Sequence, residues 1–208
     1  MPYGYTGQNL INQTVKNSGV FSISDVADLT KQGKFGGSLE LIEEQTASNA
    51  VVDFTNLKNY DVHLVQYSDI LLGSNTAGFR SRLSNDGGTS FISTGYQYAI
   101  QYAGATGGFG ESKSTNDDSF PPLAPSGNAT NIKKNGYVYY YNLLDSNKYS
   151  FCTTHNTSMF SSFYQCLFGG GVLPTAETHN AIRFTLDGGG TITSGTIKLY
   201  GVKQIWVT

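Results

Sequence analysis

The chain has 208 residues, enough to bury a sizeable core without disulfide or metal staples. Only 13% of the residues are charged and 13% are aromatic, which excludes a disordered chain, and the abundance of Gly and Tyr disfavours long helices. The formal net charge of −2 argues against a nucleic-acid partner, and no apolar run approaches the ~18 residues of a membrane helix, so no membrane insertion is expected. The one adjacent basic pair, Lys133 and Lys134, is interpreted as part of a solvated loop.

The first part of the chain predicts an arm followed by a single helix. Residues 1–20 are polar with weak periodicity, and we interpret them as an N-terminal arm for anchoring or subunit contact. They carry neither the basic nor the apolar region of a signal peptide, so we expect synthesis and folding in a cytoplasm. A short helix is predicted over residues 24–33, because Ser24 can cap it and Gly33 supplies a left-handed stop.

From residue 38 onward the hydrophobic pattern has a period of two, which is typical of strands. The predicted strands are residues 38–44, 50–54, 60–67, 79–83, 90–102, 137–141, 149–155, 162–168, 181–186, 196–200 and 204–207. No helix of crossover length separates them, which excludes parallel βαβ units. The sequence therefore predicts one all-β domain over residues 21–208, an antiparallel β-sandwich that is jelly-roll-like and has about ten strands.

A turn motif follows the strand predicted over residues 79–83. Ser84, Asp86, Gly88 and Phe91 match the Ser-x-Asp-x-Gly-x-x-Phe pattern of an Asp-box, in which the carboxylate caps backbone N–H groups and the ring packs beneath. Propellers carry several such boxes, and one copy cannot build a propeller. We interpret the motif as a structural hairpin turn.

Residues 103–134 are rich in Gly and Pro, which predicts a long surface loop. Its candidate binding residues are Phe109, Asp117, Asp118 and Phe120. The two adjacent aspartates could alternatively hold Ca²⁺ through their oxygen atoms.

Catalytic and cofactor motifs are missing from the sequence. His63, His155 and His179 are widely spaced and are interpreted as structural histidines. Adjacent acids on a strand point to opposite faces, so they do not form the carboxylate pair of a glycosidase. Cys152 and Cys166 are interpreted as small buried thiols, and pairing across neighbouring strands stays open. We therefore expect no enzyme and no bound cofactor or metal.

Tyrosine is the most informative residue type. Tyr137, Tyr139 and Tyr141 share one face of a predicted strand, and Val138 and Tyr140 share the other. The first three either pack in a core with their hydroxyls at its rim or form an exposed interface. A surface with little charge and much Tyr, Asn, Ser and Gly also suits contacts with sugars.

In their order and spacing, several stretches resemble a module that is common in virion structural proteins of tailed bacteriophages infecting marine bacteria and cyanobacteria. These stretches are residues 15–29, 36–48, 60–67, 168–174 and 195–203. The resemblance covers the chain from about Val15 onward. It carries no functional residues with it.

The resemblance implies a virion surface protein. The leading hypothesis is a tail fibre or receptor-binding protein that attaches the particle to its host, and a capsid decoration protein is the alternative. The resemblance also implies a homo-oligomer, with a trimer favoured, that contacts other virion proteins through residues 1–20. A host surface glycan or protein is the expected further partner. A carbohydrate-binding module is the second hypothesis and a polysaccharide hydrolase the third.

Overall fold

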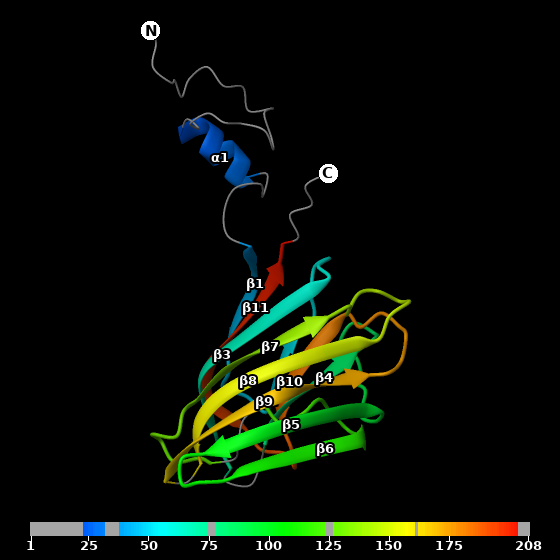
Figure 1. Ribbon diagram of the computed structural model, residues 1–208. Coiled ribbons are helices and arrows are strands. Elements are labelled where there is room, and N and C mark those ends of the chain that lie inside the picture. The colour runs from blue at the N-terminus through cyan, green and yellow to red at the C-terminus, as the bar shows by residue number, and fades with distance from the viewer. Residues whose placement is uncertain (1–22, 32–37, 75–77, 124–126, 161, 204–208) are drawn as a thin grey trace. The chain divides into compact units, whose positions relative to one another are not determined.

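The computed structural model describes residues 23–31, 38–74, 78–123, 127–160 and 162–203, and it divides into two compact units (Figure 1). The first unit, residues 1–39 and 203–208, contains helix α1 (Ile23–Lys31), close to the helix predicted over 24–33. The second unit, Glu40–Val202, is the β-sandwich. The predicted arm over residues 1–20 and the predicted strand over 204–207 lie outside the described residues. No described helix has the length and apolarity needed to cross a membrane.

Eleven strands are present among the described residues, and they form two antiparallel sheets. The strands are β1 (Leu39–Thr46), β2 (Val51–Phe54), β3 (Val62–Leu72), β4 (Phe79–Ser84), β5 (Tyr96–Gly104), β6 (Phe109–Asp117), β7 (Lys134–Tyr141), β8 (Ser150–Phe160), β9 (Phe163–Leu173), β10 (Ala181–Leu186) and β11 (Ile192–Val202). The large sheet has the order β1-β11-β3-β7-β8-β9-β5-β6, which Figure 1 shows from top to bottom, and the small sheet has the order β2-β10-β4. The predicted all-β sandwich is therefore confirmed.

The strands of the sandwich pair in a nested manner, with β1 beside β11, β2 beside β10 and β3 beside β7. A fourth pair is irregular, because the backbone N–H groups of Phe120 and Leu123 donate to carbonyls of β4. Pro121 and Pro122 stand between these two donors and have no N–H groups, so the segment does not form a regular strand. Pairing of the first half of a chain with the second half in reverse order is jelly-roll-like connectivity.

Two hairpins are inserted into this nested arrangement. Hairpin β5–β6 follows β4, and hairpin β8–β9 follows β7. Strand β8 pairs with β7, and β9 pairs with β5, so the two hairpins together extend the large sheet beyond β7. The prediction of one long loop over residues 103–134 is therefore wrong for Phe109–Asp117, which is the edge strand β6. This strand carries mostly polar residues, which are usual at sheet edges but give no hydrophobic alternation to detect.

Three buried tyrosines of the large sheet make hydrogen bonds on the side of the small sheet. The Tyr140 hydroxyl donates to Ser81 Oγ of β4 at 2.7 Å. The Tyr96 hydroxyl accepts from the backbone N–H of Leu83, also in β4, at 2.8 Å. The Tyr67 hydroxyl donates to the carbonyl oxygen of Leu123 at 2.6 Å. These bonds satisfy polar groups along β4 and its neighbouring segment that would otherwise be buried without partners.

Phe120 was predicted as an exposed binding residue, and this prediction is wrong. Its side chain is completely buried. The ring centroid lies 4.9 Å from that of Tyr96 and 5.8 Å from that of Tyr140. Burial of an aromatic ring among other rings in edge-to-face or tilted geometry is a large stabilising contribution, so Phe120 is a core residue between the sheets.

Replacement of Tyr140 by Phe tests the contact between the sheets. We expect the free energy of unfolding to fall by about 1–3 kcal/mol, because the buried Ser81 hydroxyl loses its partner. Urea unfolding followed by fluorescence measures this loss. In the double variant Tyr140→Phe/Ser81→Ala the loss should be smaller than the sum of the two single losses. Strictly additive losses would show that the two hydroxyls do not stabilise each other.

Lys134 lies at the start of β7 with its side chain completely buried. Its ammonium group donates one hydrogen bond to the carbonyl oxygen of Gly127, at 2.7 Å. Burial lowers the pKa of Lys134 to about 8 from the ordinary value of 10.5. The interpretation of Lys133 and Lys134 as a solvated basic pair is therefore wrong for Lys134.

The buried lysine makes stability depend on pH. Between about pH 8 and pH 10.5 the unfolded chain still binds the Lys134 proton while the folded chain has released it. Stability relative to Lys134→Met should therefore rise with pH in this window, by at most about 1.4 kcal/mol per pH unit. Urea unfolding of both proteins at a series of pH values measures the difference, because titrating tyrosines affect both equally. A constant difference from pH 7 to pH 11 would contradict the prediction.

Candidate functional site

The outer face of the large sheet, on strands β7, β8, β9 and β5, carries the most distinctive surface of the sandwich. Alternation along β7 directs Tyr137, Tyr139 and Tyr141 outward and buries Val138 and Tyr140, as the sequence pattern predicts. Tyr137 is 41% exposed, whereas the two inward residues are completely buried. This strand therefore supplies both a core contact and a surface.

The register of the four strands aligns their outward residues in three rows that run across the sheet. The first row is Tyr141, Phe151, Val172 and Gln97; the middle row is Tyr139, Thr153, Gly170 and Ala99; the third row is Tyr137, His155, Phe168 and Gln101. We call these positions the aromatic face. None of them is Asp, Glu, Lys or Arg, so the face carries no permanent charge.

The rings at the β7 end of the aromatic face hold one another in place. The ring centroids of Tyr137 and Tyr139 are 5.7 Å apart in edge-to-face geometry, and Tyr139 stacks on Tyr141 at 6.4 Å. The Tyr141 hydroxyl lies 3.1 Å from Thr153 Oγ1. His155 packs edge-to-face against Tyr137 at 5.9 Å and is exposed, so its structural contact lies on the surface and not in the core. Rings fixed in this way form a contact surface with little entropy left to lose on binding.

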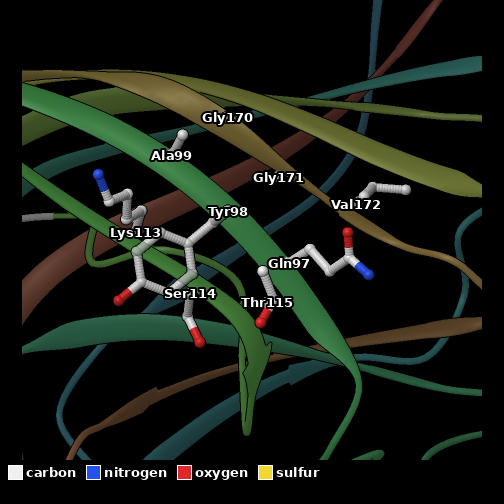
Figure 2. A pocket seen from close by; sticks show the side chains of 9 residues that line it. All are labelled: Gln97, Tyr98, Ala99, Lys113, Ser114, Thr115, Gly170, Gly171 and Val172. Atoms are coloured by element: carbon white, nitrogen blue, oxygen red, sulfur yellow. The ribbon is translucent and has the colours of Figure 1, made fainter.

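Two shallow hollows lie at the other end of the aromatic face, on β9, β5 and β6. The larger, of about 740 Å³, is lined by Gln97, Tyr98, Ala99, Lys113, Ser114, Thr115, Gly170, Gly171 and Val172 (Figure 2). The smaller, of about 320 Å³, is lined by Ala99, Ile100, Gln101, Glu111, Ser112, Lys113, Phe168 and Gly169. Both volumes fall in the range of ligand sites, about 300–1,000 Å³. The two hollows flank Ala99 and Lys113, which line both.

The glycine run of β9 explains why the middle row has so little side-chain volume. A Cβ atom on Gly170 would lie 2.4 Å from the carbonyl oxygen of Cys152 in β8. A Cβ atom on Gly169 would lie 2.4 Å from the carbonyl oxygen of Ala99 in β5. Both distances are far below van der Waals contact, so β9 approaches its two neighbours at a separation that only glycine permits. Because Gly170 has no side chain, the middle row lies lower than the rows that contain Phe151 and Phe168.

Substitution of Gly170 by Val tests this close approach. We expect the free energy of unfolding to fall by about 1–3 kcal/mol, because the new side chain displaces β9 from the backbone of β8. Thermal or urea unfolding measures the loss. Ala99→Val is the matched control, because it enlarges an exposed position of the same row and should leave stability nearly unchanged. Equal stability of Gly170→Val and the wild-type chain would contradict the prediction.

The four residues predicted to form a binding loop do not form one surface. Phe109 is 87% exposed at the start of β6, whereas Phe120 is buried. Arg80 of β4 donates to Asp117 at 3.0 Å, and Arg82 donates to Asp118. Among the described residues there is no cluster of three or more His, Cys, Asp or Glu that could hold a metal ion. The two aspartates therefore attach the end of β6 to the small sheet, and the binding and Ca²⁺ roles predicted for them stay predictions.

Arginine and aspartate form a network on the outer face of the small sheet. Arg80 also pairs with Asp187 at 3.0 Å, and Arg183 of β10 makes two hydrogen bonds of 2.7 Å to Asp53 of β2. The chain has three arginines in all, Arg80, Arg82 and Arg183, and each one is paired with an aspartate here. The outer face of the small sheet is thus held together by paired charges, whereas the aromatic face has none.

The Asp-box motif forms a compact turn. Ser84 Oγ accepts from the backbone N–H of Gly88 at 2.9 Å, and the Asp86 carboxylate accepts from the Ser90 hydroxyl at 2.6 Å and the Ser90 backbone N–H at 2.9 Å. Gly88 has a φ of 89°, which favours glycine. Hydrogen bonds from Ser90 and Ser84 lower the pKa of Asp86 to about 2. The residues of the motif thus satisfy one another, as in a structural turn.

The strands on either side of this turn do not pair with each other. Strand β4 belongs to the small sheet and β5 to the large sheet, so the prediction of a hairpin is wrong and the turn joins two sheets. The Phe91 ring lies under the guanidinium group of Arg183, 3.9 Å from its centroid. This cation–π contact fixes the turn against β10.

Neither cysteine forms a disulfide, and two of the three histidines are buried. Cys152 and Cys166 lie on the adjacent strands β8 and β9, but the register places neither opposite the other, and both are free thiols. His63 and His179 are completely buried and hydrogen-bonded, the first to the carbonyl oxygen of Leu57 at 2.7 Å. The ring of His179 lies 2.7 Å from Ser150 Oγ. Burial lowers the pKa of both histidines, which favours their neutral forms.

Sequence reasoning identified one strand of the aromatic face and missed the others. The alternation around Phe151 and Phe168 was visible within each predicted strand. The pairing that brings these rings beside Tyr137 and Tyr141 depends on long-range register, which a single sequence does not specify. No family model, curated protein or solved structure matches the chain.

Proposed function

We propose that this chain is a non-catalytic attachment module of a virus particle, and that it makes its contact through the aromatic face. The observation that carries the proposal is the neutrality and aromatic character of this face. Phe151, Phe168 and Tyr137 are each more than 40% exposed, and they lie on neighbouring strands. Exposed aromatic side chains gathered on one face of a sheet are characteristic of interaction sites.

The physical character of the aromatic face suits attachment in a salty medium. Interactions between exposed charges weaken as salt screens them, whereas burial of aromatic surface does not depend on charge. Tyrosine and phenylalanine also supply large contact areas and are enriched at protein interfaces. A particle that binds through these residues therefore keeps its affinity at the ionic strength of seawater, which is the medium that the sequence resemblance implies.

The assignment to a virion is supported by the resemblance to tailed-phage structural proteins. Within that class, a tail fibre or receptor-binding protein accounts for an exposed neutral face better than a decoration protein, whose principal contacts are with the capsid. The non-catalytic character is supported by the residues of the face. It offers rings, hydroxyls, amides and one imidazole, and no carboxylate that could act with His155 as an acid–base pair.

The proposal is tested on purified particles of the virus that carries this sequence. Antibodies against the recombinant chain should label the particles in electron micrographs, at the tail. An excess of recombinant chain should also reduce adsorption of particles to host cells, and the variant Phe151→Ala/Phe168→Ala should not. If the antibodies detect the chain in infected cells but not on particles, the proposal is overturned.

A further inference from the structure

We infer that the aromatic face binds a neutral glycan, with sugar rings occupying the two hollows that flank Ala99. This inference rests on the proposed attachment function and names the class of molecule to which the module attaches. It follows from the distribution of charge, the shape of the surface and the chemistry of its lining.

The distribution of charge favours a neutral partner. The charged residues beside the hollows are Glu111 and Lys113 of β6, and they pair with each other at 2.6 Å. At the opposite edge of the large sheet, Lys198 of β11 pairs with Glu44 of β1 at 3.1 Å. No described residue of the aromatic face itself is charged, and the two charges that line the hollows, Glu111 and Lys113, neutralise each other. Because the net charge beside the hollows is zero, an anionic polymer would gain little compensation there for its lost hydration.

The shape of the surface favours a linear chain of rings. Thr153, Gly170 and Ala99 lie side by side on β8, β9 and β5, and their small side chains form a low row across the strands. Phe151 borders this row on one side and Phe168 on the other. The hollows open on either side of Ala99, at the end of the row. A glycan that follows the row places successive units between exposed rings and in the hollows.

The chemistry of the lining matches both surfaces of a sugar. Phe151 and Phe168, 44% and 43% exposed, present apolar ring surface to the C–H groups of a pyranose. Gln97 and Gln101 border the two hollows with amides that both donate and accept hydrogen bonds. Thr115 adds a hydroxyl to the larger hollow. Apolar surface with a few polar groups that fix orientation is the usual composition of a ligand site.

The same lining disfavours a second copy of the chain as the occupant. Two sheet faces pack through interdigitated apolar side chains at close to the density of a protein core. Such packing over the hollows would bury the amides of Gln97 and Gln101. Burial of these groups without matched partners costs free energy that the hydroxyls of a glycan avoid by hydrogen bonding.

Titration calorimetry with defined oligosaccharides tests the inference. The probes are the neutral hexasaccharides of laminarin, mannan and agarose, with an alginate hexasaccharide as the anionic comparison. We expect at least one neutral probe to bind and the alginate probe not to bind. Ala99→Arg, which places a long charged side chain between the hollows, and Phe168→Ala should each weaken binding about tenfold or more.

Leu41→Ala is the matched control. Leu41 is 48% exposed on β1, at the opposite edge of the sheet from β6, so its truncation removes a comparable exposed side chain and should change affinity by less than about twofold. Circular dichroism of every variant establishes that the fold is intact.

Three results would overturn the inference: no binding of any neutral probe, tighter binding of alginate, or unchanged binding in both Ala99→Arg and Phe168→Ala. Self-association of the chain that Ala99→Arg disperses, without sugar binding, would also overturn it and assign the face to contacts between copies. The attachment proposal is judged separately by the labelling of particles. Unlabelled particles together with specific glycan binding would remove the virion assignment alone.

Discussion

The fold depends on how a three-stranded sheet covers part of an eight-stranded one. Strand β4 lies at the edge of the small sheet, where its backbone and Ser81 would be buried beside apolar residues without partners. The hydroxyls of Tyr96 and Tyr140 reach this strand from the large sheet, and the segment containing Phe120 pairs with its backbone. Because side chains of the large sheet make hydrogen bonds to polar groups of this edge strand, the two sheets are held in a defined relative position.

This arrangement accounts for the contrast between the two outer faces. The small sheet is held on its outside by arginine–aspartate pairs that also attach the end of β6. The inserted hairpins β5–β6 and β8–β9 extend the large sheet, and their inward residues complete the core through Tyr96 and Cys152. Their outward residues are thus released from any role in packing between the sheets. The molecule therefore separates most of the residues that stabilise it from those of the aromatic face, with Gly170 as an exception.

Local patterns in the sequence were sufficient for the fold class, the short helix and the division of residues 137–141 between two faces. They failed where distant segments decide the outcome. Phe120 stands beside two prolines in a polar stretch, and only the position of β4 explains its burial. Strand β6 has no apolar alternation, because an edge strand with one partner needs none. The residues that form the aromatic face could not be predicted from the sequence, because a shift of one residue in the register of β8 would turn Phe151 inward.

The hairpin insertions also bear on how the surface can change over time. Substitutions at exposed positions away from packing contacts usually alter stability by less than about 0.5 kcal/mol. Most outward positions of β8, β9 and β5 are of this kind, whereas Gly170 is confined by the backbone of its neighbour. Rings and amides on these strands can therefore be exchanged while the nested strands beneath stay as they are. At Gly170 the neighbouring backbone opposes such an exchange.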